Sequence, residues 1–221
     1  MQKKSDNKNR IVFFDFDNTI TLSDVFDDIV ERFSGDDGWK DLEERWKRSE
    51  IGSRECLKGQ VEGIRVTKRV LDRYLTTIKL DPYFKKLAGL LDSKNIRTII
   101  LSDNFDYILN GVLKAHGLDK TFEVYCNSIK FEGNRMVPSF PFSNYKCGNC
   151  GHCKKTVLGK IASAGEVLFY IGDGLSDRCA SRQVDTVFAK ADLKDYLKKE
   201  GVRHIPFEEL KDVYEHFKEA T

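Results

Sequence analysis

A short apolar run that ends in two carboxylates constrains the fold of this sequence more than any other stretch. Residues Ile11–Phe14 contain no polar side chain, which is typical of a strand buried on both faces. Asp15 and Asp17 follow directly, and a turn at Asn18 would let the second carboxylate swing back beside the first. Two like charges at the end of a buried strand are unfavourable unless a cation lies between them, and carboxylate oxygens suit Mg²⁺. Taken alone, this stretch could also be a strand end followed by two solvated loop acids.

Two later apolar runs also end in small or acidic polar residues. Thr98–Leu101 leads into the cluster at 102–104, and Val167–Ile171 leads into the cluster at 172–177. Helical patterns separate the three runs, so the order of elements predicts a Rossmann-like α/β fold, with a parallel sheet covered by helices on both faces. Because such sheets carry their chemistry at the carboxyl ends of the strands, we expect the three polar clusters to converge.

The stretch between the first strand and residue 80 has helical patterns only. We expect residues 22–80 to form a small all-helical cap, inserted into a core made of residues 10–21 and 81–221, after a disordered tail at 1–9. The first cap helix is predicted to carry an apolar stripe from Leu22 to Phe33, with Ser23 as its N-cap. Trp39 and Trp46 are expected in the interior of the cap, with a place in a substrate pocket as the alternative. In the core, residues 122–130 and 135–140 read as a β-hairpin, and 184–188 as a later strand.

Composition and charge exclude several classes of protein. The chain has 221 residues, and its 37 basic and 35 acidic side chains nearly cancel, so nothing favours binding to nucleic acid or to an anionic membrane. No signal peptide or membrane-spanning run is present, and six cysteines without an export signal favour reduced thiols or metal ligands over disulfides. We therefore expect a cytoplasmic protein, either a monomer or a homodimer.

The polar clusters have the residue types that phosphoryl transfer needs. Three carboxylates with a main-chain oxygen can hold Mg²⁺ together with a substrate phosphate, and a carboxylate beside the ion is a competent nucleophile at phosphorus. A second acid can protonate the leaving alkoxide and then activate water. A hydroxyl and an ammonium would hold the phosphoryl oxygens, and here Ser102 supplies the first and Lys154 or Lys155 the second.

These residues resemble, in order and spacing, the four motifs of the haloacid-dehalogenase (HAD) phosphatase superfamily. The resemblance covers residues 10–190. It implies that Asp15 is the nucleophile, that Asp17 is the general acid/base, and that Ser102 and Lys154 bind the phosphoryl group. It also implies that Asp173 ligates Mg²⁺ together with Asp15 and the Asp17 carbonyl, while Asp177 steadies the lysine and the metal ligands. Dehalogenases proper lack the second aspartate of the first motif, so Asp17 indicates phosphate esters.

The helical insertion resembles the C1 cap of the phosphoserine-phosphatase-like branch of that superfamily. The first motif with Asp24, and Cys150-Gly-His-Cys153-Lys154 at the third motif, are similar to methionine-salvage phosphatases that act on an enol-phosphate of 5-methylthiopentane. The same region resembles phosphoethanolamine/phosphocholine phosphatases. Those enzymes share a Ser-Asp second motif, whereas the methionine-salvage and phosphoserine enzymes usually have Ser-Gly-Gly. Here Ser102-Asp103-Asn104 stands in that place.

The sequence allows two interpretations of several residues. Asp24, Asp103 and Asn104 are candidate substrate-binding residues, but both aspartates could equally be helix caps.

Cys147, Cys150 and Cys153 have a spacing that can hold Zn²⁺, with His152 or Cys126 as a fourth ligand. They could equally be reduced thiols that pack the loop beside Lys154, or include a redox pair. Cys56 and Cys179 are expected to be buried fillers.

We therefore predict a Mg²⁺-dependent hydrolase of a small phosphorylated metabolite. The methionine-salvage enol-phosphate, phosphoethanolamine, phosphocholine and phosphoserine are the candidate substrates. A phosphotransferase or mutase that uses the same aspartyl-phosphate is one alternative, and a non-enzymatic phosphate and Mg²⁺ sensor is another. A dinucleotide-dependent oxidoreductase is disfavoured, because no Gly-x-Gly-x-x-Gly follows any strand.

Overall fold

A mostly parallel sheet of seven strands forms the centre of the computed structural model, which describes residues 9–133, 135–147 and 150–219. The strand order is β4-β3-β2-β1-β5-β6-β7. The strands are β1 (Arg10–Phe14), β2 (Arg97–Phe105), β3 (Glu123–Glu132), β4 (Arg135–Ser139), β5 (Val167–Gly172), β6 (Thr186–Ala189) and β7 (Ile205–Pro206). All neighbours are parallel except β3 and β4. The predicted α/β fold and the predicted hairpin are therefore confirmed. The disordered tail was predicted for residues 1–9, and positions 1–8 lie outside the described residues.

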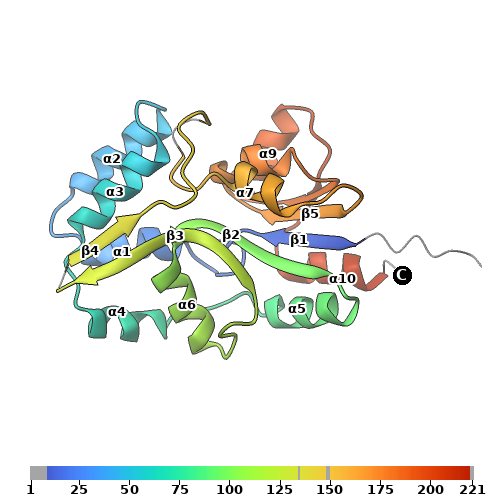
Figure 1. Ribbon diagram of the computed structural model, residues 1–221, viewed down its shortest axis with the longest axis horizontal. Helices are drawn as coiled ribbons and strands as arrows, with labels where there is room; N and C mark the ends of the chain where they lie inside the picture. The colour runs from blue at the N-terminus through green and yellow to red at the C-terminus, as the bar shows by residue number, and fades with distance from the viewer. Residues whose placement is uncertain (1–8, 134, 148–149, 220–221) are drawn as a thin grey trace, which may run out of the picture.

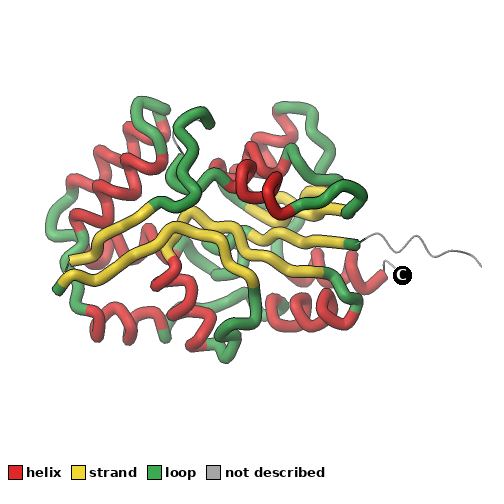
Figure 2. The backbone as a smooth tube through the Cα atoms, in the orientation of Figure 1, coloured by secondary structure: helices red, strands yellow, loops and turns green. Residues whose placement is uncertain are grey.

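Helices cover both faces of this sheet (Figure 1). Alternate residues of β1 divide between the two faces: Val12 and Phe14 pack with one group of helices, while Ile11 and Phe13 pack with the other. The first group is α5 (Phe84–Ser93), α6 (Asp106–Ala115) and α10 (Leu210–Glu219), and the second includes α7 (Lys154–Ile161) and α8 (Arg178–Ser181). Helix α9 (Ala191–Lys199) packs on β6 through Leu193 and Leu197. Figure 2 shows the strands as one layer between these helices.

Four helices occupy the chain between β1 and α5: α1 (Val25–Phe33), α2 (Gly38–Lys47), α3 (Ser53–Gly63) and α4 (Lys68–Leu75). The two segments that connect them to the rest lie side by side, because Thr21 and Leu80 form an antiparallel bridge and the Leu22 N–H donates to the Lys79 carbonyl at 3.0 Å. Buried side chains of α1, α3 and α4 belong to the same apolar cluster as those of α5 and α6. The insertion therefore shares a core with the sheet-bearing part of the chain.

Three details of this insertion differ from the sequence-based expectations. Leu22 is 57% exposed, because its backbone pairs with residue 79 in extended conformation and the helix starts only at Val25. The N-cap of α1 is consequently Asp24, whose carboxylate accepts from the Asp27 N–H at 2.9 Å, and not Ser23. Helix α2 has no buried residue, so its two tryptophans are half-buried at the surface of the insertion and not in its interior.

The second strand also continues beyond its predicted end at Leu101. Its pairing with β3 shifts register between Leu101 and Phe105, which keeps residues 102–104 in the strand while changing their alignment. β7 has only two residues and had no recognisable sequence pattern. None of the helices in the described part of the chain combines the length and the apolar character needed to cross a membrane.

Candidate active site

The topology brings the three predicted polar clusters to one edge of the sheet. β1 lies between β2 and β5 and runs parallel to both, so the carboxyl ends of these strands are neighbours. Asp15 follows the last residue of β1, Ser102 lies near the end of β2, and Asp173 follows β5. All three are buried, with 5%, 0% and 8% of their surface exposed.

A buried ammonium group connects two of the acids. Lys154, the first residue of α7, is 2% exposed, and its Nζ lies 2.6 Å from Asp15 Oδ1 and 2.7 Å from Asp177 Oδ1. Ser176 Oγ accepts from the same Nζ at 3.1 Å. Burial alone would lower the pKa of this lysine, but Asp15 and Asp177 outweigh burial and raise it well above its usual value. Lys154 is therefore a fixed positive charge between the two carboxylates.

Asp177 is held by a complete set of donors. Its Oδ1 accepts from Lys154 and from the Tyr170 hydroxyl at 2.6 Å, and its Oδ2 accepts from the N–H groups of Asp173 and Gly174 at 3.1 and 3.2 Å. Both oxygens are thus already occupied. This carboxylate orients the lysine and the turn after β5.

Gly172 makes this close packing possible. A Cβ added there would clash with Asp177 Oδ2 and would lie 2.9 Å from a ring carbon of Tyr170. We expect Gly172→Ala to lower the free energy of unfolding by about 1–3 kcal/mol, because neither neighbour can move without breaking its hydrogen bond. Thermal and urea unfolding measure this effect. Gly89→Ala in α5 is the matched control: the added methyl has nothing within 4 Å and should stabilise the helix by up to about 1 kcal/mol. Equal stability of Gly172→Ala and wild type would contradict the packing described here.

Asp15, Asp173 and Asp177 place carboxylate oxygens within 4.8 Å of one another. Burial and the charge of Asp177 raise the pKa of Asp15 well above its usual range, although Lys154 opposes them, and burial raises the pKa of Asp173 to about 6. Clustered acids with raised pKa values are an unfavourable arrangement that a divalent cation would relieve, and hard oxygen donors suit Mg²⁺. The donor set therefore fits Mg²⁺. Thr19 Oγ1 donates to Asp173 at 3.1 Å and orients it.

The carboxylate of Asp17 points away from this group. Asn18 has a positive φ of 52°, a left-handed conformation that asparagine tolerates, and the resulting turn directs Asp17 toward α1 and β2. Its Oδ1 accepts from the Val25 N–H at 2.9 Å, and both of its oxygens accept from Asn104 Nδ2 at 3.0–3.1 Å. Burial, followed by the charge of Asp24, raises the pKa of Asp17 well above its usual value, and these hydrogen bonds only partly offset the rise. These surroundings therefore favour the protonated form of Asp17 more than those of an exposed carboxyl would.

A pocket opens beside Asp17 between the sheet edge and helices α1, α2 and α3. Its lining residues are Asp17, Asp24, Phe26, Asp27, Glu43, Trp46, Ser53, Cys56, Leu57, Gln60, Asp103 and Asn104. Five of these side chains are carboxylates, and the described lining includes no lysine or arginine. Burial raises the pKa of Asp24 to about 7 and that of Asp27 to about 6, with acidic neighbours adding to both shifts.

The candidate substrate-binding residues now have distinct positions. Asp24 both caps α1 and lines the pocket, so its two interpretations hold together. Asp103 lines the pocket and is not the N-cap of α6, which is Phe105. Asn104 lines the pocket and bonds to Asp17, while its N–H donates to Ser102 Oγ at 3.1 Å.

Other members of the site were not identified from the sequence. Thr19 lies two residues after Asp17 in the same loop, and Tyr170 shares a strand face with Gly172, so local spacing could have suggested both. Asp27 and Glu43 carry no local signal, because only the packing of α1 and α2 brings them to the pocket. Trp46 lines it too, as the alternative interpretation allowed. Among the cysteines, Cys56 is buried at the pocket, but Cys179 is exposed, so its prediction as a buried filler is wrong.

The fold has well-covered counterparts among solved structures. A phospho-aspartyl intermediate analogue of phosphoserine phosphatase superposes with a TM-score of 0.72 at 16% identity, covering 95% of this chain and 99% of the other. Phosphoserine phosphatase from T. onnurineus gives 0.71 at 17% identity, covering 99% and 98%. The fold is that of these phosphoserine phosphatases.

The chain belongs to the family described as "Putative Phosphatase", which matches residues 10–206. Two curated relatives are both named 2-hydroxy-3-keto-5-methylthiopentenyl-1-phosphate phosphatase. The one from Exiguobacterium sp. is 28% identical over 213 residues, which are 94% of this chain and 96% of the relative. The one from Bacillus cereus is 25% identical over 211 residues, or 94% and 95%. The protein is accordingly a phosphoric monoester hydrolase of the HAD type.

Proposed function

We propose that the chain hydrolyses a small phosphomonoester through a phosphoryl group carried on Asp15. The observation that carries this proposal is the position of that carboxylate, which is buried directly after β1 and lies 2.6 Å from Lys154 and within 4.8 Å of two further acids. A carboxylate held beside a fixed positive charge can attack phosphorus without strong repulsion from the phosphate oxygens.

The reaction would proceed in two displacements. An oxygen of Asp15 forms a bond to phosphorus while the ester P–O bond breaks, and the leaving alkoxide takes the proton held by Asp17. Asp17 then removes a proton from water, whose oxygen attacks phosphorus and releases inorganic phosphate and free Asp15. Ser102 and Lys154 would bind the phosphoryl oxygens during both displacements. The raised pKa of Asp17 supports its assignment as the acid, since a carboxyl of ordinary pKa would have no proton to give at neutral pH.

The Mg²⁺ site would use Asp15, Asp173 and the main-chain carbonyl of Asp17. Asp177 would orient Lys154 and the turn after β5 and would not bind the ion directly, because both of its oxygens already accept hydrogen bonds. When bound, the ion supplies positive charge that offsets the clustered carboxylates and the phosphoryl oxygens.

Residues 22–80 would act as a cap that covers the pocket. Two observations support this assignment: α1, α2 and α3 contribute lining residues to the pocket, and the two connections to the cap pair with each other at Thr21 and Leu80.

The pocket favours a substrate whose leaving group carries a positive charge. Asp24, Asp27, Glu43 and Asp103 would surround such a group with negative charge, and Trp46 offers an aromatic face of the kind that binds ammonium groups. Phosphocholine and phosphoethanolamine have this chemistry. The named relatives instead support a methylthio-substituted enol phosphate, for which Phe26, Trp46 and Leu57 would be the apolar contacts. The acidic lining of the pocket favours the cationic substrates, phosphocholine and phosphoethanolamine.

A matched pair of substrates tests the charge preference. Phosphocholine and its uncharged carbon isostere neohexyl phosphate have nearly the same shape, so the ratio of their kcat/KM values isolates the positive charge. We expect phosphocholine to be preferred by at least about 10-fold, and Asp103→Asn to reduce that preference while leaving neohexyl phosphate little changed. If neohexyl phosphate or the methylthio enol phosphate reacts better, the cationic substrate class is wrong.

Turnover of p-nitrophenyl phosphate, with and without Mg²⁺, tests the hydrolase assignment separately. A rate that is unchanged after chelation of Mg²⁺ would contradict the Mg²⁺ site.

The same ratio should depend on pH. The pKa of Asp24 is raised to about 7 and that of Asp27 to about 6, so the pocket gains negative charge as both lose protons with rising pH. From about pH 5.5 to about pH 8 the preference for phosphocholine should increase by at least about 5-fold, since each added charge near a cation contributes about 1 kcal/mol. Both esters share the titration of the phosphate and of the catalytic acids, which therefore cancels. Asp24→Asn should flatten the profile, and an unchanged profile in that variant would contradict the assignment.

A further inference from the structure

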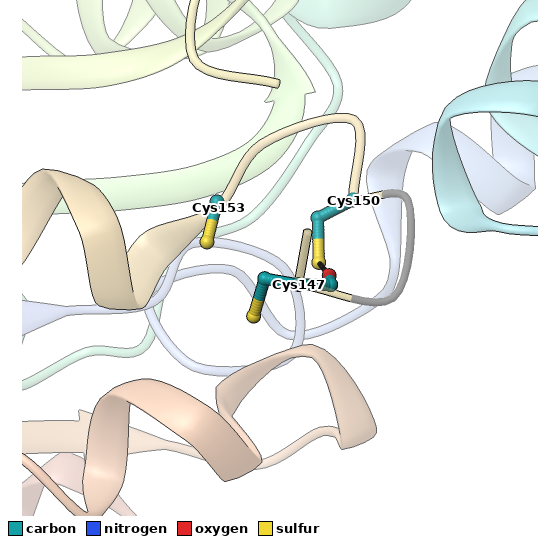
Figure 3. A group of neighbouring side chains, drawn as sticks. All are labelled: Cys147, Cys150 and Cys153. Atoms are coloured by element: carbon teal, nitrogen blue, oxygen red, sulfur yellow. Dashed lines mark hydrogen bonds between the residues drawn. The ribbon is translucent and has the colours of Figure 1, made fainter. Parts of the chain in front are cut away.

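Three cysteines in the loop before α7 form a second cluster of metal-ligating side chains, separate from the acids. The Sγ atoms of Cys147, Cys150 and Cys153 all lie within 4.8 Å of one another, and all three thiols are free. Figure 3 shows the three side chains grouped in this loop, with the Cys150 thiol hydrogen-bonded to the Cys147 carbonyl. Three thiolates around one tetrahedral Zn²⁺ are about 3.8 Å apart, given a Zn–S distance of about 2.3 Å, so a small contraction would complete the arrangement.

Packing alone does not account for these thiols. None of the three belongs to the apolar clusters formed by the described residues, and Cys147 and Cys150 are only half-buried. Cys153 is buried but in polar surroundings: the Thr156 hydroxyl lies 3.0 Å from its sulfur, and Asn144 Nδ2 lies 3.8 Å away. Donors at these positions stabilise a thiolate, which is the form that binds metal.

A buried histidine lies in the same loop, outside the group of three thiols and packed against the Phe142 ring. His152 is 5% exposed, and neither of its ring nitrogens has a hydrogen-bond partner among the described residues. A buried imidazole without a hydrogen bond is unfavourable, and coordination would satisfy one nitrogen if the loop brought it to the ion.

We propose that Cys147, Cys150 and Cys153 bind one Zn²⁺ ion, which holds the loop between α3 and the first turn of α7. Thiolates select soft cations such as Zn²⁺, whereas the carboxylates at the sheet edge suit Mg²⁺, so the two sites are chemically distinct. The loop already contacts α3, because the Gly151 N–H donates to Ser53 Oγ at 3.0 Å and the Arg54 guanidinium lies 4.9 Å from the Tyr145 ring centroid. It also contains the N-cap of α7, next to Lys154. The bound ion would therefore fix the entry to the helix that carries Lys154.

Metal content of the full chain tests this proposal. Protein purified under reducing conditions and dialysed against excess Mg²⁺ should retain about one zinc per chain, as for a structural site. Cys147→Ser and Cys153→Ser should each lower that content at least about 5-fold. Cys56→Ala, which removes a buried thiol at the substrate pocket, should retain the zinc. Asp173→Asn should retain it as well, which excludes zinc bound at the acids.

Cobalt gives a readout that is independent of activity. Co²⁺ added to the metal-free chain should produce an intense thiolate-to-metal charge-transfer absorption in wild type and in Asp173→Asn, and none in Cys147→Ser. Zinc below about 0.1 equivalent in wild type together with no cobalt band would overturn the proposal. Zinc that persists in Cys147→Ser, or a disulfide between Cys147 and Cys150 in the reduced preparation, would overturn it equally. None of these results bears on the assignment of Asp15 as the nucleophile, which is tested separately.

Discussion

Asp15→Asn should lower kcat for p-nitrophenyl phosphate by at least about 10⁴-fold, since the nucleophile is removed and not merely displaced. The amide has nearly the shape of the carboxylate but is a far poorer nucleophile at phosphorus. Lys154 would keep its position, because Asp177 still accepts from it at 2.7 Å. Steady-state kinetics at saturating Mg²⁺ measures the loss. Acid-quenched protein should carry the phosphoryl group of a labelled substrate in wild type but not in the variant.

The stability of Asp15→Asn should separate chemistry from folding. Burial and Asp177 raise the pKa of Asp15 above its unfolded value despite Lys154, so its ionised form destabilises the fold at neutral pH in the absence of Mg²⁺. The asparagine variant should therefore be at least as stable as wild type without Mg²⁺. Asp37→Asn, which changes an exposed aspartate of the insertion, is the matched control and should keep full activity. Turnover of Asp15→Asn within about 10-fold of wild type would remove the nucleophile assignment.

Lys154→Met should be the most destabilising substitution at the site. It preserves most of the aliphatic chain but removes the only ammonium seen to contact Asp15 and Asp177 in the described residues. Leaving buried carboxylates without their partner costs about 3–5 kcal/mol, and losing a charge on the phosphoryl oxygens should cost about 10²–10³ in kcat. Urea unfolding and steady-state kinetics measure the two effects.

The pH dependence of that loss identifies its cause. Above the pKa of Asp15 its carboxylate is charged and would lack its partner in the variant, whereas below that pKa it is protonated and needs no partner. The stability difference between wild type and Lys154→Met should therefore be larger at about pH 8 than at about pH 5. Lys155→Ala is the matched control, because the neighbouring side chain is exposed. A larger loss of kcat in Lys155→Ala than in Lys154→Met would assign phosphoryl binding to Lys155 instead of Lys154.

The short apolar strands were the most predictable part of this protein. A strand buried on both faces is largely apolar, so Ile11–Phe14, Thr98–Leu101 and Val167–Ile171 could be recognised without any partner. Parallel strands separated by helices then place their carboxyl ends at one edge, so the convergence of the acids followed from the order of the elements. The positions of the polar residues after β1 and β5 were therefore sufficient to predict that they lie close together.

The insertion was predicted less well, because its details depend on contacts between distant segments. The pairing of residues 21–22 with residues 79–80 delays the start of α1, exposes Leu22 and moves the cap to Asp24. The two interpretations of Asp103 could be separated only when the register shift in β2 placed it at the pocket. The exposure of Cys179 likewise depends on how α8 packs, and not on any local pattern.

The sequence by itself determined the class of fold and the acids at the sheet edge. A strand buried on both faces appears as a short apolar run, and the order of these runs and of the helical patterns between them gives the order of the elements. Only the tertiary structure decided which groups each acid meets. Asp15 and Asp177 are 162 positions apart and share Lys154, and Asp17 reaches Asn104 across 87 positions. The acidic pocket likewise exists only because α1, α2 and α3 pack against the end of β2, and charge at such a distance in sequence leaves no local pattern.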